Sequence, residues 1–311
     1  MRPKRVLLAT KKTPLEHFKE GSDDFARRLP SPELERIRSG HDEHYATLHH
    51  VEKLLSARGI VVERSYMPYA AYEDFLGKDL VITVGGDGTV LNSSHYILDG
   101  TPLLAVRSDQ HSTGALCSVE ANSFEAALDR VFEDRFELEW WTRVAVSLAG
   151  TQTLALNEVY LGDLYSPGMA RYELEFGGAA EVQASSGVIV SSGTGSTGWY
   201  RNATRADPFP KNSKELRFAV REYLTDAGYR LTRGAIQPGE VLRIRSMMNV
   251  DGCVSLDGDK HKRAYPFERG TVAEVRVADQ PLGMIRPRWG EVKSKATTGA
   301  VQRIDEQTGG A

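Results

Sequence analysis

The chain has 311 residues, and its 39 Lys and Arg against 42 Asp and Glu give a formal net charge of −3. A sequence pI of about 6.3 argues against a protein built mainly to neutralise nucleic acid, which requires a basic face. With Cys117 and Cys253 as its two cysteines, the chain excludes a disulfide framework and a cysteine-based zinc cluster. We therefore expect a cytoplasmic protein with reduced thiols and no nucleic-acid partner.

A membrane partner is not expected either. The longest stretch without a charge, residues 182–200, is rich in Ser, Gly and Thr, whereas a spanning helix needs about 20 mostly apolar residues. Residues 6–9 are apolar but too few for a signal sequence, so we interpret them as part of a first strand.

Strand-like and helix-like segments alternate over the first part of the chain. Short apolar runs predict strands at residues 5–9, 60–62, 80–84 and 102–106. Apolar residues at helical spacing predict helices at residues 33–58, 90–98 and 123–132. Strands interleaved with helices imply a mostly parallel sheet. We therefore expect an α/β domain with a Rossmann-like sheet over residues 1–137.

Beyond residue 136 the pattern changes to short alternating segments separated by Gly, Asp, Ser and Pro. These predict strands at residues 139–148, 153–161, 171–176, 187–191, 241–246, 253–256 and 271–277. One helix is expected at about residues 214–226. The sequence therefore predicts a β-rich domain over residues 138–285, followed by a polar, partly mobile tail over residues 286–311.

The strongest motif follows the apolar strand 80–84 directly and reads Gly85-Gly86-Asp87-Gly88-Thr89. Adjacent glycines let backbone N–H groups approach an anion, and a following helix N-terminus favours negative charge. In an open α/β sheet, ligands bind at the carboxyl ends of the strands, where this turn lies. Asp87 can accept a proton from an attacking hydroxyl. The motif indicates a site for polyphosphate and a hydroxyl acceptor; a structural turn with Asp87 as helix N-cap is the plainer alternative.

A second glycine-rich loop follows the strand 187–191 and reads Gly193-Thr194-Gly195-Ser196-Thr197-Gly198. It matches the dinucleotide fingerprint only formally, because residues 202–212 hold two prolines and no strand pattern. We expect the loop to offer N–H and O–H donors to a ribose or a phosphate, with a flexible Ser/Gly loop as the alternative.

Asn157 and Glu158 lie in a predicted alternating strand, which places them on opposite faces, so at most one points into a given site. A solvated strand position is the alternative for either. Two Asp-Gly pairs, at Asp251 and Asp257, predict hairpin turns. The histidines lack metal-ligand spacing, so no metal site within the protein is predicted.

Four segments in this order resemble the NAD kinase family: GGDGT (85–89), NE (157–158), SSGVIVSSGTGST (185–197) and LDG (256–258). The resemblance covers about residues 5–285. It implies ATP- and Mg²⁺-dependent phosphorylation of the adenosine ribose 2′-hydroxyl of NAD to give NADP, with the site between an α/β domain and a β-rich domain. It also implies a homo-oligomer, with a dimer favoured.

The resemblance also implies roles for the motif residues. Asp87 would be the general base or a metal-linked carboxylate at the 2′-hydroxyl, and the phosphate path would be lined by Gly85, Gly86, Gly88 and Thr89. Asn157 and Glu158 would hold NAD. The nucleotide would be contacted from the second domain by Gly193, Thr194, Gly195, Ser196 and Thr197.

Three departures from the bacterial family pattern place the chain closer to the branch that includes the animal mitochondrial NAD kinase. Residues 107–117 replace an Asn followed by Leu-Gly-Phe, Ser186 stands where Ser-Asp-Gly has its aspartate, and Gly-Gly-Pro is absent after the second loop. The residue that neutralises the transferred phosphoryl group stays open among Arg107, Arg143, Arg171 and Arg201. The sequence also leaves open whether the phosphoryl donor is ATP or polyphosphate, and whether the acceptor is NAD or NADH.

Two alternatives to this function are weighed. A kinase of the same superfamily could act on a sugar or another small molecule, because Ser186 alters the substrate side. A non-catalytic nucleotide sensor on the same fold should have lost its carboxylate, whereas Asp87 is intact.

Overall fold

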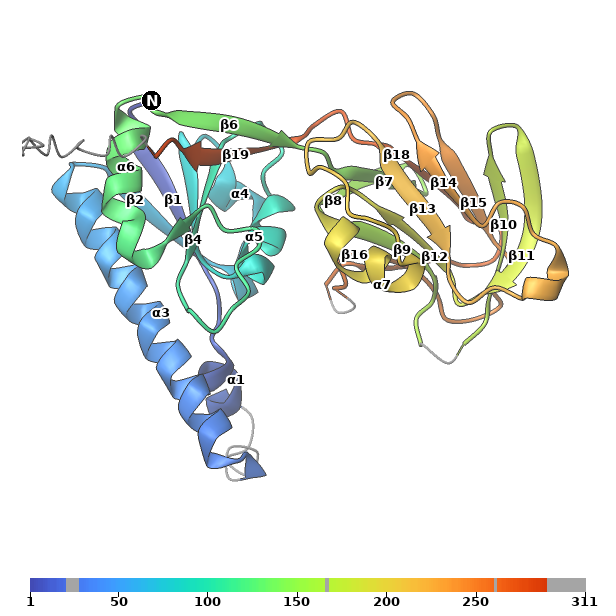
Figure 1. The fold of residues 1–311 in the computed structure, drawn as a ribbon, viewed down its shortest axis with the longest axis horizontal. Coiled ribbons are helices and arrows are strands. Elements are labelled where there is room, and N and C mark those ends of the chain that lie inside the picture. The colour runs from blue at the N-terminus through green and yellow to red at the C-terminus, as the bar shows by residue number, and fades with distance from the viewer. Residues whose placement is uncertain (21–27, 166–167, 260–261, 290–311) are drawn as a thin grey trace, which may run out of the picture.

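The computed structural model describes residues 1–20, 28–165, 168–259 and 262–289, and these form two lobes (Figure 1). The first lobe contains a seven-stranded sheet in the order β2-β1-β3-β4-β19-β6, with β5 paired to β4. Its strands are β1 (Arg5–Thr10), β2 (Val61–Tyr66), β3 (Leu80–Gly85), β4 (Leu103–Arg107), β5 (Val119–Glu120), β6 (Phe136–Trp141) and β19 (Leu282–Pro287). All pairs are parallel except β6 with β19. The predicted α/β sheet is confirmed.

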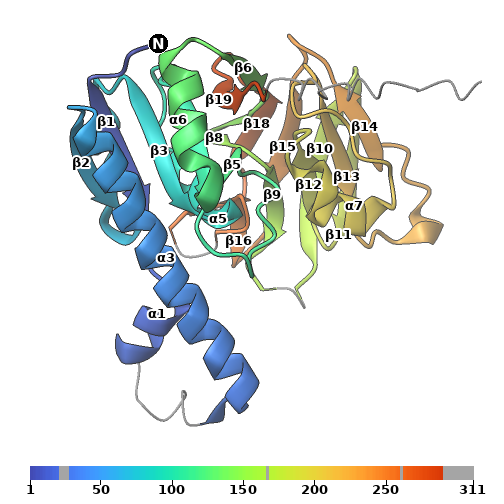
Figure 2. The ribbon, with the colours of Figure 1, turned by 60° about the vertical axis from the view of Figure 1, so that its left-hand side comes forward.

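Helices cover both faces of this sheet, which is why its central strands are apolar throughout. One face packs against α3 (Ser31–Ala57) and α6 (Phe124–Phe132). The other packs against α4 (Tyr72–Phe75), α5 (Asp87–Ser94) and the 3₁₀ turn η1 (Met67–Tyr69). The first helix, α1 (Pro14–Glu20), lies beside α3 where α3 extends beyond the sheet (Figures 1 and 2). A short 3₁₀ turn, η2 (Ala121–Ser123), precedes α6.

The second lobe consists of two antiparallel six-stranded sheets that share one apolar core. One sheet runs β11-β10-β15-β18-β7-β8 and contains β7 (Val144–Leu148), β8 (Thr151–Ala155), β10 (Ala170–Phe176), β11 (Ala179–Ser185), β15 (Leu242–Ser246) and β18 (Val272–Val277). The other runs β14-β13-β12-β9-β16-β17 and contains β9 (Glu158–Asp163), β12 (Val188–Ser191), β13 (Leu216–Val220), β14 (Arg233–Ile236), β16 (Gly252–Leu256) and β17 (Ala264–Pro266). Three short helical segments join these strands: η3 (Gly195–Thr197), α7 (Trp199–Thr204) and η4 (Thr225–Ala227). The predicted β-rich character is confirmed.

The helix predicted at about residues 214–226 is wrong. Residues Leu216–Val220 form β13, which pairs with β12 on one side and β14 on the other. Leu216 and Phe218 enter the core between the two sheets, so strand pairing and burial outweigh the weak helical spacing of this segment. The strand predicted over residues 153–161 is also interrupted, because β8 ends at Ala155 and β9 begins at Glu158.

Two strands near the lobe junction belong to the first sheet although they flank the second lobe in sequence. β6 pairs with β19, and β19 pairs with β4. The predicted divisions at 137/138 and 285/286 therefore fall inside β6 and β19. From this pairing we propose that the first unit consists of the chain up to β6 together with β19. Of the predicted tail, residues 290–311 lie outside the described part of the chain.

Arg143 joins the two lobes at this junction and is not in a position to bind phosphate. Its side chain is buried, and its guanidinium donates to the carbonyl oxygens of Ser94 (3.0 Å), Ile97 (3.0 Å) and Gln280 (2.7 Å). Burial lowers the pKa of Arg143 to about 10. These bonds hold the carboxyl end of α5 against the two segments that connect the lobes, one between β6 and β7 and the other between β18 and β19. Among helices in the described ranges, none combines the length and apolar content needed to cross a bilayer.

Candidate active site

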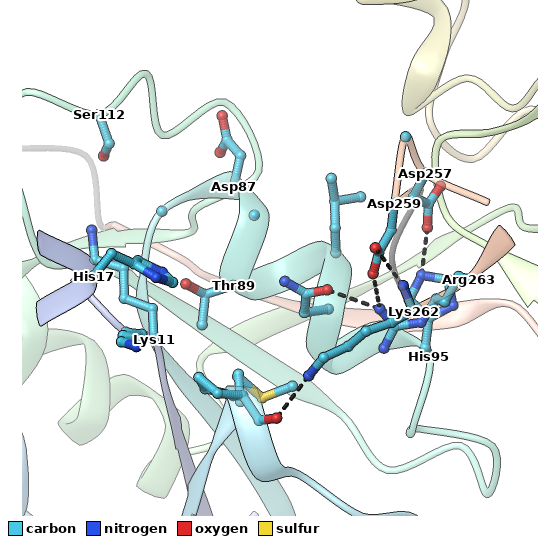
Figure 3. Close-up of a pocket in the computed structure, with 18 of the residues that line it drawn as sticks. Lys11, His17, Asp87, Thr89, His95, Ser112, Asp257, Asp259, Lys262 and Arg263 are labelled. Carbon is cyan, nitrogen blue, oxygen red and sulfur yellow. Dashed lines mark hydrogen bonds and ion pairs between the residues drawn. The ribbon is translucent and has the colours of Figure 1, made fainter. Parts of the chain in front are cut away.

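A cleft of about 740 Å³ opens at the carboxyl end of the parallel sheet (Figure 3). The first lobe contributes the segment after β1, α1, η1, the turn between β3 and α5, and the loop after β4. The second lobe contributes the turn between β16 and β17. Both lobes therefore line one cavity, at the sheet edge where ligands bind in open α/β folds.

The GGDGT turn forms one wall of this cleft. A Cβ on Gly85 would overlap the side chain of Thr89, so only glycine permits this close turn. Gly86 is the residue that precedes α5, and Asp87 is the first residue of the helix. The alternative of Asp87 as N-cap is therefore wrong. Gly86, Asp87, Gly88 and Thr89 all line the cleft.

One hydrogen bond from the described residues holds the Asp87 carboxylate. Its Oδ1 accepts the backbone N–H of Leu116 at 2.8 Å, and the side chain lies on the same side of the cleft as Ser112 (Figure 3). Leu116 and Ser112 belong to the segment after β4, where the sequence departs from the bacterial pattern. This bond orients the carboxylate through one oxygen and leaves Oδ2 for a ligand.

Asp257 lines the cleft, a role that was not predicted for it, because it was interpreted as a hairpin turn and as part of the LDG segment of the resemblance. It does occupy a turn with φ 52°, but its side chain is 2% exposed. The carboxylate accepts the N–H groups of Leu156 (3.0 Å), Asn157 (2.6 Å) and Glu158 (3.1 Å). His95 Nε2, at the end of α5, lies 2.9 Å from Asp257 Oδ2. Asp257 therefore connects the NE segment to the helix that begins at Asp87. The LDG motif, which contains Asp257, was the sequence signal that could have identified it as a site residue.

Asn157 and Glu158 occupy the break between β8 and β9. Among the residues that the structure describes, the buried side-chain oxygen of Asn157 has no hydrogen-bond partner, which marks it as a candidate ligand contact. Glu158 is 7% exposed, and burial together with the nearby charge of Asp257 raises the pKa of Glu158 to about 8. A carboxyl group in such a position holds its proton near neutral pH and can donate a hydrogen bond.

The raised pKa of Glu158 predicts a specific pH dependence of stability. The unfolded chain releases this proton near pH 4.5, whereas the folded protein retains it to about pH 8. The contribution of Glu158 to stability is therefore fully present below pH 4.5 and is lost as pH rises to 8. We expect the wild type to lose on the order of a few kcal/mol relative to Glu158→Gln over this range. Urea unfolding of both proteins at pH 5, 6.5 and 8 measures the difference; parallel curves would contradict the prediction.

The second glycine-rich loop lies directly behind the NE segment. A Cβ on Gly195 would overlap the carbonyl of Asn157, and one on Gly193 would overlap the carbonyl of Pro210. Thr194 and Ser196 are buried, and the hydroxyl of Thr194 has no hydrogen-bond partner within the described part of the chain. The described residues that line the cleft include neither Asn157 and Glu158 nor the predicted loop residues Gly193, Thr194, Gly195, Ser196 and Thr197. The structure thus places the loop against Asn157 and Glu158 and leaves its contact with nucleotide a prediction.

The basic residues in the cleft are not the four arginines proposed from the sequence. Arg107 donates to the carbonyl oxygen of Gln110 and pairs with Glu120, so it stabilises the loop after β4. Among the described lining residues, the basic ones are instead Lys11, Lys12, His17, His95, Lys262 and Arg263. Sequence reasoning missed them because no glycine motif surrounds them.

Curated relatives of this chain are NAD kinases and NADH kinases. A probable NADH kinase from Oryza sativa subsp. japonica is 30% identical over 230 residues, which cover 66% of this chain and 69% of the rice protein. The mitochondrial NAD kinase 2 from Homo sapiens is 27% identical over 259 residues, covering 66% of this chain and 59% of the human protein. No family model matches the chain.

Solved structures of NAD kinases share this fold. The crystal structure of an NAD kinase from Archaeoglobus fulgidus, in complex with ATP, has a TM-score of 0.65 at 17% identity and covers 91% of this chain and 94% of that one. The yeast NADH kinase complexed with NADH also has a TM-score of 0.65, at 16% identity, covering 93% and 85%.

Proposed function

Because this chain belongs to the NAD kinase family, we propose that it transfers a phosphoryl group from ATP to the adenosine ribose 2′-hydroxyl of NAD. One observation carries the proposal. A glycine turn at the carboxyl end of the sheet places Asp87 on a cleft that both lobes line. Such an arrangement can hold a polyphosphate and a second, hydroxyl-bearing ligand together, which is what phosphoryl transfer requires of a protein.

Asp87 is proposed as the general base. Its Oδ1 is fixed by the N–H of Leu116, and Oδ2 is left to accept the proton of the attacking hydroxyl. The hydroxyl oxygen then forms a bond to the terminal phosphorus of the donor. The bond from that phosphorus to the leaving phosphate oxygen breaks, and its electron pair stays on the leaving group.

A magnesium ion would arrive at the cleft with the phosphates of the donor. Asp257 already accepts three N–H groups, and Asp259 pairs with Arg263 at 2.9 Å. Asp87 Oδ2 is assigned to the hydroxyl proton, so the donor phosphates and water would supply most ligands of the ion, as is common for Mg²⁺. When bound, the ion would neutralise charge on the donor phosphates.

The acceptor is proposed to contact the second lobe through Asn157 and Glu158. The unpartnered oxygen of Asn157 can accept a hydrogen bond, and the protonated carboxyl of Glu158 can donate one. The loop 193–197 supports both residues from behind. Assembly as a homodimer and a cytoplasmic location stay predictions.

A coupled assay tests the proposed function. The purified protein is incubated with Mg-ATP and either NAD or NADH, and the phosphorylated product is detected with an NADP- or NADPH-specific enzyme. Parallel arms replace ATP with inorganic polyphosphate and replace the acceptor with a panel of sugars. We expect product from NAD or NADH with ATP. Phosphorylation of a sugar with neither dinucleotide turned over would assign the protein to a different kinase activity.

A further inference from the structure

Lys11 stands beside the phosphate-binding turn because of strand register. β1 pairs in parallel with β3, and Thr10 lies opposite Val84. Lys11 follows Thr10 and Gly85 follows Val84, so both lie at the same edge of the sheet. Lys11 lines the cleft together with Gly86 and Thr89, and Figure 3 shows it on the side of His17, away from Arg263.

The basic residues at the opposite end of the cleft are already used to join the lobes. The Lys262 ammonium donates to the carbonyl oxygen of Pro68 at 2.7 Å. The Arg263 guanidinium donates to Asn92 Oδ1 at 3.0 Å and to Asp259 Oδ2 at 2.9 Å. Both side chains therefore connect the β16–β17 turn to the first lobe.

Lys11 is held more loosely. Its Nζ lies 3.8 Å from Asp109 Oδ2, which is longer than a hydrogen bond, and the side chain is 22% exposed. An ammonium group has three donors, so it can bind phosphate oxygens without first breaking a hydrogen bond to Asp109. Lys12, the next residue, also lines the cleft but takes part in an interaction within the protein.

A buried histidine links the residue before Lys11 to the residue before Asp109. His44, from α3, is fully buried, with Nε2 3.0 Å from the hydroxyl of Thr10 and Nδ1 2.9 Å from the hydroxyl of Ser108. Thr10 precedes Lys11, and Ser108 precedes Asp109. Burial lowers the pKa of His44 to about 4, so the link is a neutral imidazole at neutral pH. The position of Lys11 is thus set by the ends of β1 and β4.

We propose that Lys11 binds the phosphoryl group that passes from donor to acceptor and neutralises its charge. This inference rests on the proposed function and adds the cation that the reaction requires. The hydroxyl proton goes to Asp87, so Lys11 takes no part in proton transfer. Its ammonium group acts on the non-bridging oxygens, where negative charge is spread during phosphoryl transfer.

The test compares Lys11→Met, Lys11→Arg and a matched control, Lys53→Met. Lys53 is an exposed lysine on α3, outside the lining of the cleft. Calorimetry with inorganic tripolyphosphate, which has neither base nor ribose, measures phosphate binding directly. Steady-state kinetics with ATP and NAD or NADH measure kcat and both KM values.

We expect Lys11→Met to weaken tripolyphosphate binding about 10- to 100-fold, as for loss of a charge-assisted hydrogen bond. The same variant should lower kcat about 100-fold or more, with the KM for NAD or NADH nearly unchanged. Lys11→Arg should recover most of the binding, and Lys53→Met should match the wild type.

Equal tripolyphosphate affinities for the wild type and Lys11→Met would overturn the assignment, whatever the activity. An unchanged kcat in Lys11→Met would overturn it as well. If Lys11→Met loses phosphate binding while the wild type turns over neither NAD nor NADH, the phosphate contact is supported and the proposed acceptor fails. The two proposals are therefore separable.

Discussion

Replacing Asp87 with Asn is expected to lower kcat about 10²- to 10⁴-fold, the usual contribution of a general base. The substituted amide keeps an oxygen at the position of Oδ1, so it can still accept the N–H of Leu116 at 2.8 Å and preserve the loop after β4. It cannot take the proton of an attacking hydroxyl. The fold, measured by thermal unfolding, and the KM for NAD should change little.

The matched control for this substitution is Asp79→Asn. Asp79 also accepts backbone N–H groups, from Lys4 at 2.8 Å and Arg5 at 2.9 Å, but it lies at the amino end of β3, opposite the cleft. Its substitution should leave kcat unchanged. Wild-type turnover in Asp87→Asn would remove Asp87 from the chemistry, whereas an equal loss in both variants would indicate a general effect on the sheet.

The first lobe was predictable because local pattern and tertiary role agree there. The strand at Leu80–Gly85 is apolar because helices cover both faces, and the turn after it needs glycine for close approach to Thr89. The long helix ends where Gly59 adopts φ 70°, as glycine after a helix often does. In each case one short stretch of sequence contains the whole physical reason.

The second lobe shows where such reasoning fails. β13 is set by its two neighbouring strands, which come from distant parts of the chain, so its own spacing misled the prediction. Lys11 enters the site only through the register of β1 with β3. The role of Asp257 depends on three N–H groups about a hundred residues earlier. A single sequence does not reveal which distant segments meet.

Replacing Asp257 with Ala is expected to destabilise the protein by about 3–5 kcal/mol, because it leaves buried donors without an acceptor. The N–H groups of Leu156, Asn157 and Glu158 would all lose their partner, as would His95. Asp257→Asn should lose less, about 1–3 kcal/mol, since one oxygen remains while its NH₂ group faces another donor. Urea unfolding gives both values. The KM for NAD should rise in Asp257→Asn, because the NE segment loses part of its support.

The control and a second readout separate this role from that of an ordinary turn residue. Asp251 has nearly the same backbone conformation, with φ 58°, and also precedes a glycine, but it is exposed. Asp251→Asn should therefore be nearly neutral, since asparagine tolerates this conformation. Asp257→Asn should also weaken the pH dependence attributed to Glu158, because the charge of Asp257 helps to raise the pKa of that carboxyl. Equal stability losses at both turns, with the pH dependence unchanged, would mean that Asp257 acts through its backbone alone.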